Sequence, residues 1–297
     1  MGRSHREEPS LTVVCTGRPG APPLQRPEAR TIAVVSGKGG VGKTTLAANL
    51  AIAVRRRQHP VLLVDGDWGM ANVDLQLWLS PQHTLHHVLT GEKGIEEIVL
   101  TADSGVRVLP GASGVEEMAN LDEVRCERLL CSISETVDRR DLILVDTPSG
   151  INRIALHLAR AADEVIVVTT PEPSSLADAY ASLKLVADPP GGTRPWIVVN
   201  RAADSGEGRE AYERIREVSR SFLSVEPALL GIVLEDPRVG SAIRSRMPIL
   251  KLYPRSTGSK CIDQLASRLL DTHEPEPLES EDPQRPRKIA NLEDAPA

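Results

Sequence analysis

The stretch 31-TIAVVSGKGGVGKTTLAANL-50 decides the fold, because an apolar run ends in a glycine-rich loop that leads into a helical pattern. Glycines let such a loop curl until successive backbone N–H groups point at phosphate oxygens, and the positive end of the following helix adds to the attraction. Lys43 is expected to reach the β- and γ-phosphates, and the Thr44 hydroxyl to bind Mg²⁺. The loop is therefore predicted to bind the nucleotide through Gly37, Lys38, Gly39, Gly40, Val41, Gly42, Lys43, Thr44 and Thr45.

Apolar runs alternate with helical patterns over the rest of the chain. Several runs, such as VLLVD and LILVD, are apolar throughout, which is typical of parallel strands covered by helices on both faces. The alternation predicts an α/β fold, a doubly wound and mostly parallel sheet of the P-loop NTPase type, in a single domain of residues 30–271. Strands are expected at residues 31–36, 61–65, 106–109, 142–146, 164–169, 196–200 and 229–234, and the later helices at 123–136, 152–162, 174–186, 207–222, 237–246 and 256–270.

Composition excludes several classes of protein. The net charge of −6 argues against strong nucleic-acid binding, whose affinity comes largely from Lys and Arg at phosphates. No apolar run approaches the ~20 residues of a membrane span, and the N-terminus lacks the apolar core of a signal peptide, so we expect a cytoplasmic protein. The polar, proline-rich residues 1–29 and the acidic, proline-broken residues 272–297 are predicted to be disordered tails.

Acidic residues stand where two predicted strands end. Asp65 and Asp67 are two residues apart, so we expect both carboxylates on the same side of the strand, at its carboxyl edge. Asp146 closes the apolar run LILVD and takes the Walker B position, where an acid holds Mg²⁺ through water. Ligands of such sheets bind at this edge, beside the glycine-rich loop.

Lys38 gives the loop a second lysine, and the resulting GKGGVGKT resembles the signature of the deviant Walker A ATPases, the group of MinD and ParA. The resemblance covers about residues 30–270. It implies a slow ATPase in which Lys38 crosses a dimer interface to the partner's ATP, Lys43 and Asp67 share in catalysis, and Asp67 joins Thr44 and Asp146 at the metal. It also implies adenine contacts from Asn200 and Arg201. The alternatives are a solvated Lys38 and an Asn200 that caps the following turn.

Longer stretches, among them GMANVDLQLWL and PEPSSLADAYASLKL, most resemble the MinD-like regulators of flagellar placement and number, called FlhG or FleN. That resemblance implies an ATP-bound homodimer that regulates flagellar assembly or cellular positioning. Its partner would be an SRP-type GTPase or a flagellar or transcriptional regulator. A ParA-type DNA-partitioning ATPase is the alternative. Membrane contact is expected to be weak, because residues 272–297 form no amphipathic pattern and the stripe Ile262, Leu265, Leu269 and Leu270 is predicted to pack in the core.

Overall fold

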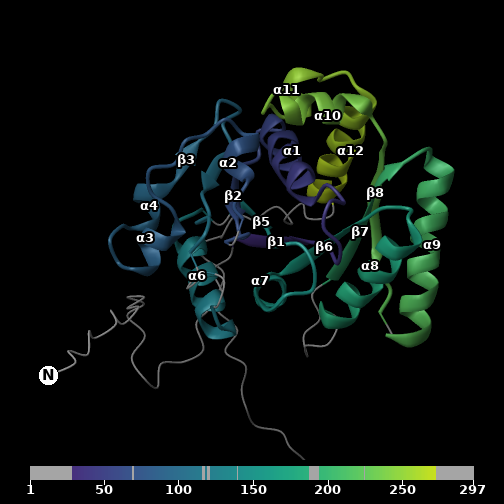
Figure 1. Cartoon of the computed structure of the whole chain (residues 1–297), viewed down its shortest axis with the longest axis horizontal. Helices are drawn as coiled ribbons and strands as arrows, with labels where there is room; N and C mark the ends of the chain where they lie inside the picture. Colours follow the sequence, from purple (N-terminus) through teal and green to yellow (C-terminus); the bar gives the residue numbers. More distant parts are fainter. Residues whose placement is uncertain are drawn as a thin grey trace, which may run out of the picture.

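The computed structural model describes residues 29–271, apart from residues 69, 116–117, 119–120, 139, 187–193 and 224. Within them the chain forms a sheet of eight strands in the order β3-β4-β2-β5-β1-β6-β7-β8 (Figure 1). All neighbours pair in parallel except β3 and β4. The strands are β1 (Arg30–Val35), β2 (Val61–Asp65), β3 (Leu100–Thr101), β4 (Arg107–Leu109), β5 (Leu142–Asp146), β6 (Glu164–Thr169), β7 (Arg194–Ala202) and β8 (Ala228–Leu234).

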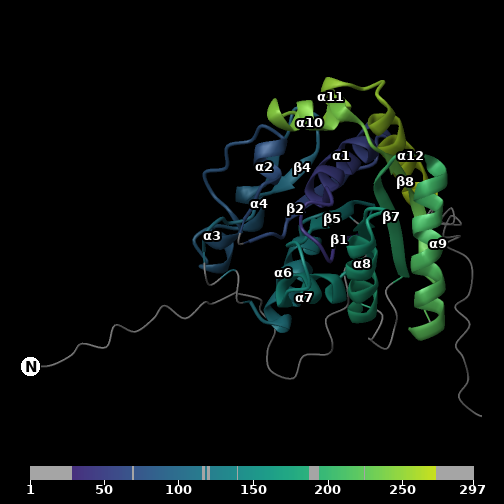
Figure 2. The same cartoon turned by 45° about the vertical axis from the view of Figure 1, so that its right-hand side comes forward.

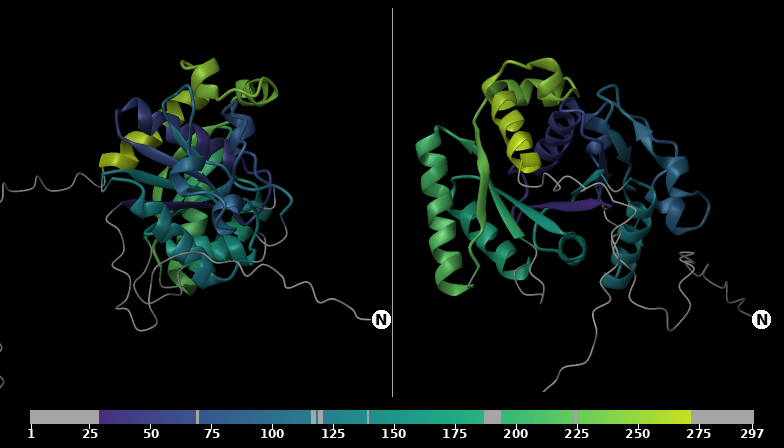
Figure 3. Two further views of the ribbon diagram at one scale, coloured as in Figure 1. Left: turned by 90° about the vertical axis from the view of Figure 1, so that its left-hand side faces the viewer. Right: turned by 180° about the vertical axis from the view of Figure 1, so that it is seen from behind.

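Helices cover both faces of the sheet, as the turned views show (Figures 2 and 3). On one face α1 (Lys43–Arg56) packs against α12 (Thr257–Asp271), and the short helices α2 (Val73–Gln76), α10 (Pro237–Arg244) and α11 (Ile249–Leu252) lie around them. The opposite face carries α6 (Glu123–Glu135), α7 (Arg153–Ala161), α8 (Pro173–Val186) and α9 (Ser205–Phe222). Two further short helices, α3 (Leu85–Leu89) and α4 (Ile95–Ile98), come between α2 and β3 in the chain.

The central strand β1 shows why the apolar runs are continuous. Ile32 and Val34 pack into the cluster beneath α1 and α12, whereas Ala33 and Val35 pack beneath α7 and α8. Successive side chains of a strand point to opposite faces, so a strand with a helical layer on each side must be apolar at every position. The stripe Ile262, Leu265 and Leu269 of α12 is buried in the first cluster, with Leu270 packed against it, which confirms the predicted core role.

The doubly wound sheet and its seven predicted strands are confirmed, and the errors concern short elements. The sequence did not predict β3, which has two residues and pairs antiparallel with β4, nor the helices α2, α3, α4 and α11. Helices of four or five residues are too short to show a helical period, and a two-residue strand shows no alternation. No helix among residues 29–271, so far as they are described, is long and apolar enough to span a membrane. Residues 1–28 and 272–297 of the expected tails lie outside the described residues, and Ala29, the last residue of the expected N-terminal tail, is buried.

Candidate functional site

The glycine-rich loop leaves the carboxyl end of β1, between the neighbouring strands β5 and β6. Two positions of this loop require glycine, one because of its neighbours and one because of its backbone conformation. A β-carbon at Gly37 would lie 2.2 Å from the carbonyl oxygen of Asp178 in α8, and Gly42 has a φ of 90°. Glycine alone tolerates both demands without strain. The loop ends at Gly42, directly before α1, whose first turn contains no acidic residue. This combination leaves the helix N-terminus available to an anion.

Lys43 is buried at the centre of the site. Its Nζ donates to Oδ1 of Asp146 at 2.7 Å and also to the carbonyl oxygen of Thr147. The two side chains of the ion pair are 3% and 1% exposed. Burial raises the pKa of Asp146, although the ammonium of Lys43 acts in the opposite direction. A phosphate group that entered the loop would offer this ammonium a second anionic partner.

The surroundings of Asp146 fit a magnesium ion. Its second carboxylate oxygen, Oδ2, is buried and has no hydrogen-bond partner among the described residues. The hydroxyl of Thr44 lies against the same carboxylate, and the charge of Asp67 acts on it as well. Mg²⁺ prefers hard oxygen ligands and keeps several waters. The residues present therefore match the donor set that the sequence predicts.

Asp65 and Asp67 have different environments, and only Asp65 lies on the strand, so the expectation that both belong to one strand is wrong. The strand β2 ends at Asp65, and the alternation of side chains ends with it. The Asp65 carboxylate is buried and accepts the backbone N–H groups of Asp67, Asn72 and Val73 at 2.9–3.1 Å. Burial, with the nearby charge of Asp146, raises the pKa of Asp65 to about 7. Asp65 thus shapes the loop, whereas Asp67 is partly exposed.

Lys38 lies in the same loop as Lys43 but extends to the surface. Its Nζ donates to Oε2 of Glu172 at 2.8 Å and to the hydroxyl of Ser174 at 3.0 Å. The lysine and glutamate side chains are 39% and 57% exposed. Lys38 is therefore no freely solvated residue in this structure. Glu172 and Ser174 follow the end of β6 at the same sheet edge, and no motif in the sequence marks them as site residues.

Asn200 and Arg201 end β7 beside the loop. The Asn200 amide donates to the carbonyl oxygen of Val41 at 2.7 Å, and its Oδ1 accepts the N–H of Arg201. Arg201 has a φ of 59° and approaches Glu235 at 3.6 Å. Asn200 thus braces the glycine-rich loop, and the adenine contacts of both residues stay predictions.

Comparisons with known proteins agree with this geometry. A family model described as an AAA domain matches residues 29–187. The antiactivator FleN of Pseudomonas aeruginosa is 36% identical over 81% of this chain and 86% of its own length. The chain belongs to the MinD/ParA-type ATPases.

Two further relatives place the chain within that family. The flagellum site-determining protein YlxH of Helicobacter pylori is 32% identical over 84% of each chain. The structure of the septum site-determining protein MinD of Pyrococcus horikoshii, complexed with Mg-ADP, superposes with a TM-score of 0.70 and is 30% identical, covering 82% of this chain and 97% of that one. This chain is therefore a P-loop ATPase of the MinD type, from a family that uses Mg²⁺ and a nucleotide.

Proposed function

We propose that this MinD-type ATPase binds Mg·ATP with the residues that the sequence predicts. The N–H groups of residues 37–45 would hold the phosphates, and Lys43 would exchange the Asp146 carboxylate for the terminal phosphates. Thr44 and Asp146, with Asp67, would hold the metal, which would neutralise developing charge on the phosphates. The unpartnered Oδ2 of Asp146 supports this assignment.

Hydrolysis would depend on a second copy of the chain. Asp67 would position the attacking water, and Lys38 would supply its charge to the ATP of the partner subunit, as an arginine finger does. One observation carries this proposal. The ammonium of Lys38 contacts α8 at the surface rather than the buried acids of its own site, although Lys38 and Lys43 belong to one loop. A surface lysine beside the site is available to a second subunit.

The ATP-bound dimer would act as a switch in flagellar assembly or cellular positioning. The relative YlxH, 32% identical, is a flagellum site-determining protein, and FleN, 36% identical, is an antiactivator; these two names favour the role over DNA partitioning. The partner would be a flagellar or transcriptional regulator or an SRP-type GTPase. Deletion of the gene should change the number or position of flagella, and the Lys43→Ala gene should fail to restore them.

The experiment that tests the switch measures mass by light scattering with ADP and with ATP. Asp67→Ala should bind Mg·ATP, hydrolyse it at least about 100-fold more slowly, and accumulate as a dimer, because the phosphate site stays intact while water positioning is lost. Glu96→Gln, an exposed acid on α4, serves as the matched control and should behave as wild type. A monomeric Asp67→Ala protein at saturating ATP would refute the dimer, and normal turnover would refute the role of Asp67.

A further inference from the structure

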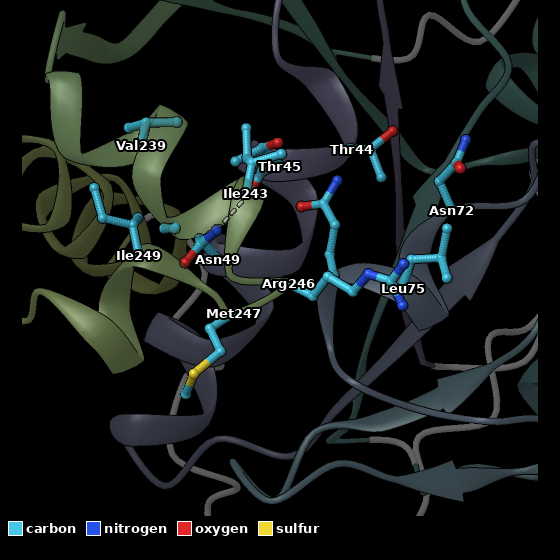
Figure 4. A pocket seen from close by; sticks show the side chains of 12 residues that line it. Thr44, Thr45, Asn49, Asn72, Leu75, Val239, Ile243, Arg246, Met247 and Ile249 are labelled. Carbon is cyan, nitrogen blue, oxygen red and sulfur yellow. Dashed lines mark hydrogen bonds between the residues drawn. The ribbon is translucent and has the colours of Figure 1, made fainter.

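A long groove crosses the outer surface of α1 between α2 and the α10–α11 segment. It consists of two cavities of about 330 Å³ each, which share Arg246 and Met247 as lining residues. The first cavity borders the proposed nucleotide site at Thr44 and Thr45 and extends to Leu75, and Figure 4 shows Arg246 reaching across it towards Leu75. The second is bounded by Trp78. We call the two joined cavities the α2–α10 groove.

The groove exposes large apolar side chains that proteins ordinarily cover. Trp78, Ile243 and Leu75 are 70%, 50% and 48% exposed. Scattered apolar residues on a surface are common, but a contiguous set along a hollow marks a binding surface. Leu75 and Ile243 line the first cavity and Trp78 the second, and Met247 lines both.

Backbone strain points to the same place. Trp78 and Arg246 have φ values of 56° and 50° and are two of only four non-glycine residues with positive φ in the described part of the chain. Both line the second cavity. For a bulky residue such as tryptophan this conformation is a true outlier, and strain of this kind gathers at functional sites.

The charge beside the groove selects an acidic ligand. Arg246 and its neighbour Arg244 are both exposed, and neither forms an ion pair within the described residues, where Arg244 bonds the neutral hydroxyl of Ser241. Lys251, which also lines the second cavity, is already paired with Asp103. A ligand that joins apolar side chains to carboxylates would match both properties of the groove.

The chain contains such a segment. Residues 289–294 read IANLED, with Ile289 and Leu292 followed by Glu293 and Asp294. Residues 272–297 hold seven acidic and three basic residues, a net charge of −4, whereas residues 1–28 hold three acidic and four basic residues, a net charge of +1. Charge therefore favours the C-terminal segment over the N-terminal one.

The chain that follows α12 is long enough for residues 289–294 to reach the groove. Helix α12 begins beside α10, where the N–H of Gly258 donates to Asp236, and ends near β1, where Leu269 accepts from Arg30. The chain must return along this helix, about 22 Å at 1.5 Å per residue. Residues 272–288 reach up to about 56 Å when extended. We propose that residues 289–294 of the same chain dock in the α2–α10 groove, with Ile289 and Leu292 on its apolar wall and Glu293 and Asp294 at Arg244 and Arg246.

Acrylamide quenching of tryptophan fluorescence in the full chain tests the proposal, because Trp68 and Trp196 are buried and Trp78 is the tryptophan that the segment would cover. The double variant Ile289→Asp/Leu292→Asp should raise the quenching constant at least about twofold, since it removes both apolar contacts. Adding Trp78→Phe should remove that difference. Leu278→Asp, in the same tail but outside the segment, is the matched control and should change nothing. Equal quenching in wild type and the double variant would overturn the proposal.

A charge exchange separates this docking from other ways of covering Trp78. Glu293→Arg/Asp294→Arg should expose Trp78, and Arg244→Glu/Arg246→Glu in the same chain should protect it again. The protection should not change over an about 100-fold range of protein concentration, because a tethered segment binds intramolecularly. Protection that grows with concentration would assign the groove to a second copy. Protection that survives every tail substitution would assign it to another part of the protein, and either result would overturn the proposal.

Discussion

Two lysines five residues apart in the same loop form ion pairs of almost equal length in opposite environments. Lys43 meets Asp146 at 2.7 Å with both side chains buried, and Lys38 meets Glu172 at 2.8 Å with side chains that are 39% and 57% exposed. Water weakens the exposed pair severalfold relative to a pair in the interior. The buried contact therefore belongs to the framework of the site, while the exposed one can break at little cost. The two ion pairs therefore have similar lengths but differ in how easily they break: the Lys43 pair is held in place, whereas the Lys38 pair can open.

The largest expected effect follows from removing the buried lysine. Lys43→Ala should abolish binding of a fluorescent ATP analogue in equilibrium titration, because the loop loses the cation between the terminal phosphates. Lys38→Ala is the matched control from the same loop and should keep its affinity within about threefold, since the phosphates are held mainly by N–H groups and Lys43. Binding by Lys43→Ala within a factor of about two of wild type would contradict the assignment of the loop.

Lys43→Ala should also destabilise the fold, by about 3–5 kcal/mol, because it leaves the Asp146 carboxylate buried without its cation. The double variant Lys43→Met/Asp146→Asn should regain much of this loss in urea unfolding, since it removes both charges. If the double variant is no more stable than Lys43→Ala, the buried pair is not the source of the loss.

The exposed lysine should matter only when two subunits meet. Lys38→Ala should lose most ATP-dependent dimerisation and about 10³-fold in hydrolysis, the range of a finger-type charge. Steady-state phosphate release and light scattering on the same samples check both effects. A Lys38→Ala protein that dimerises and hydrolyses ATP like wild type would reduce this lysine to a surface residue, and the contrast between the two lysines would lose its functional meaning.

Burial also governs the response of the apo protein to pH. The pKa of Asp65 is about 7 in the folded chain and near 4 when unfolded, so the folded state binds more protons between these values. The free energy of unfolding should therefore fall as pH rises from about 4 to 7, by up to about 4 kcal/mol from this group. Asp65→Asn should flatten the pH dependence in urea titrations, and Glu96→Gln should not. An unchanged slope in Asp65→Asn would place the dependence elsewhere.

The smallest expected effect concerns the contact that holds Lys38 in the single subunit. Glu172→Gln removes the charge of an exposed pair, so it should strengthen ATP-dependent dimerisation about two- to fivefold, and high salt should erase the difference. Glu210→Gln, which breaks the comparable exposed pair with Arg214, provides the control and should have no effect. Weaker dimerisation of Glu172→Gln would mean that this carboxylate assists closure instead of restraining Lys38.

The sequence predicted what depends on local pattern. Continuous apolar runs revealed the central strands, and the glycine-lysine spacing revealed the loop, because each feature needs its residues close together in the chain. Contacts across the chain were not predictable in this way. Lys38 and Glu172 are 134 residues apart, and the fold alone brings them together. The strand alternation assumed for Asp65 and Asp67 failed because β2 ends at Asp65, and only the loop geometry shows that the first acid holds backbone N–H groups.

The close approach of Gly37 to the Asp178 carbonyl has a mechanical consequence. No side chain separates the loop from α8 there, since even a methyl group would lie 2.2 Å from that oxygen. Densely packed backbones transmit displacement instead of absorbing it. The same helix begins at Pro173, between the two residues that hold Lys38. A displacement of α8 would therefore move the glycine-rich loop and the contacts of Lys38 together. This helix thus couples its outer surface to the loop.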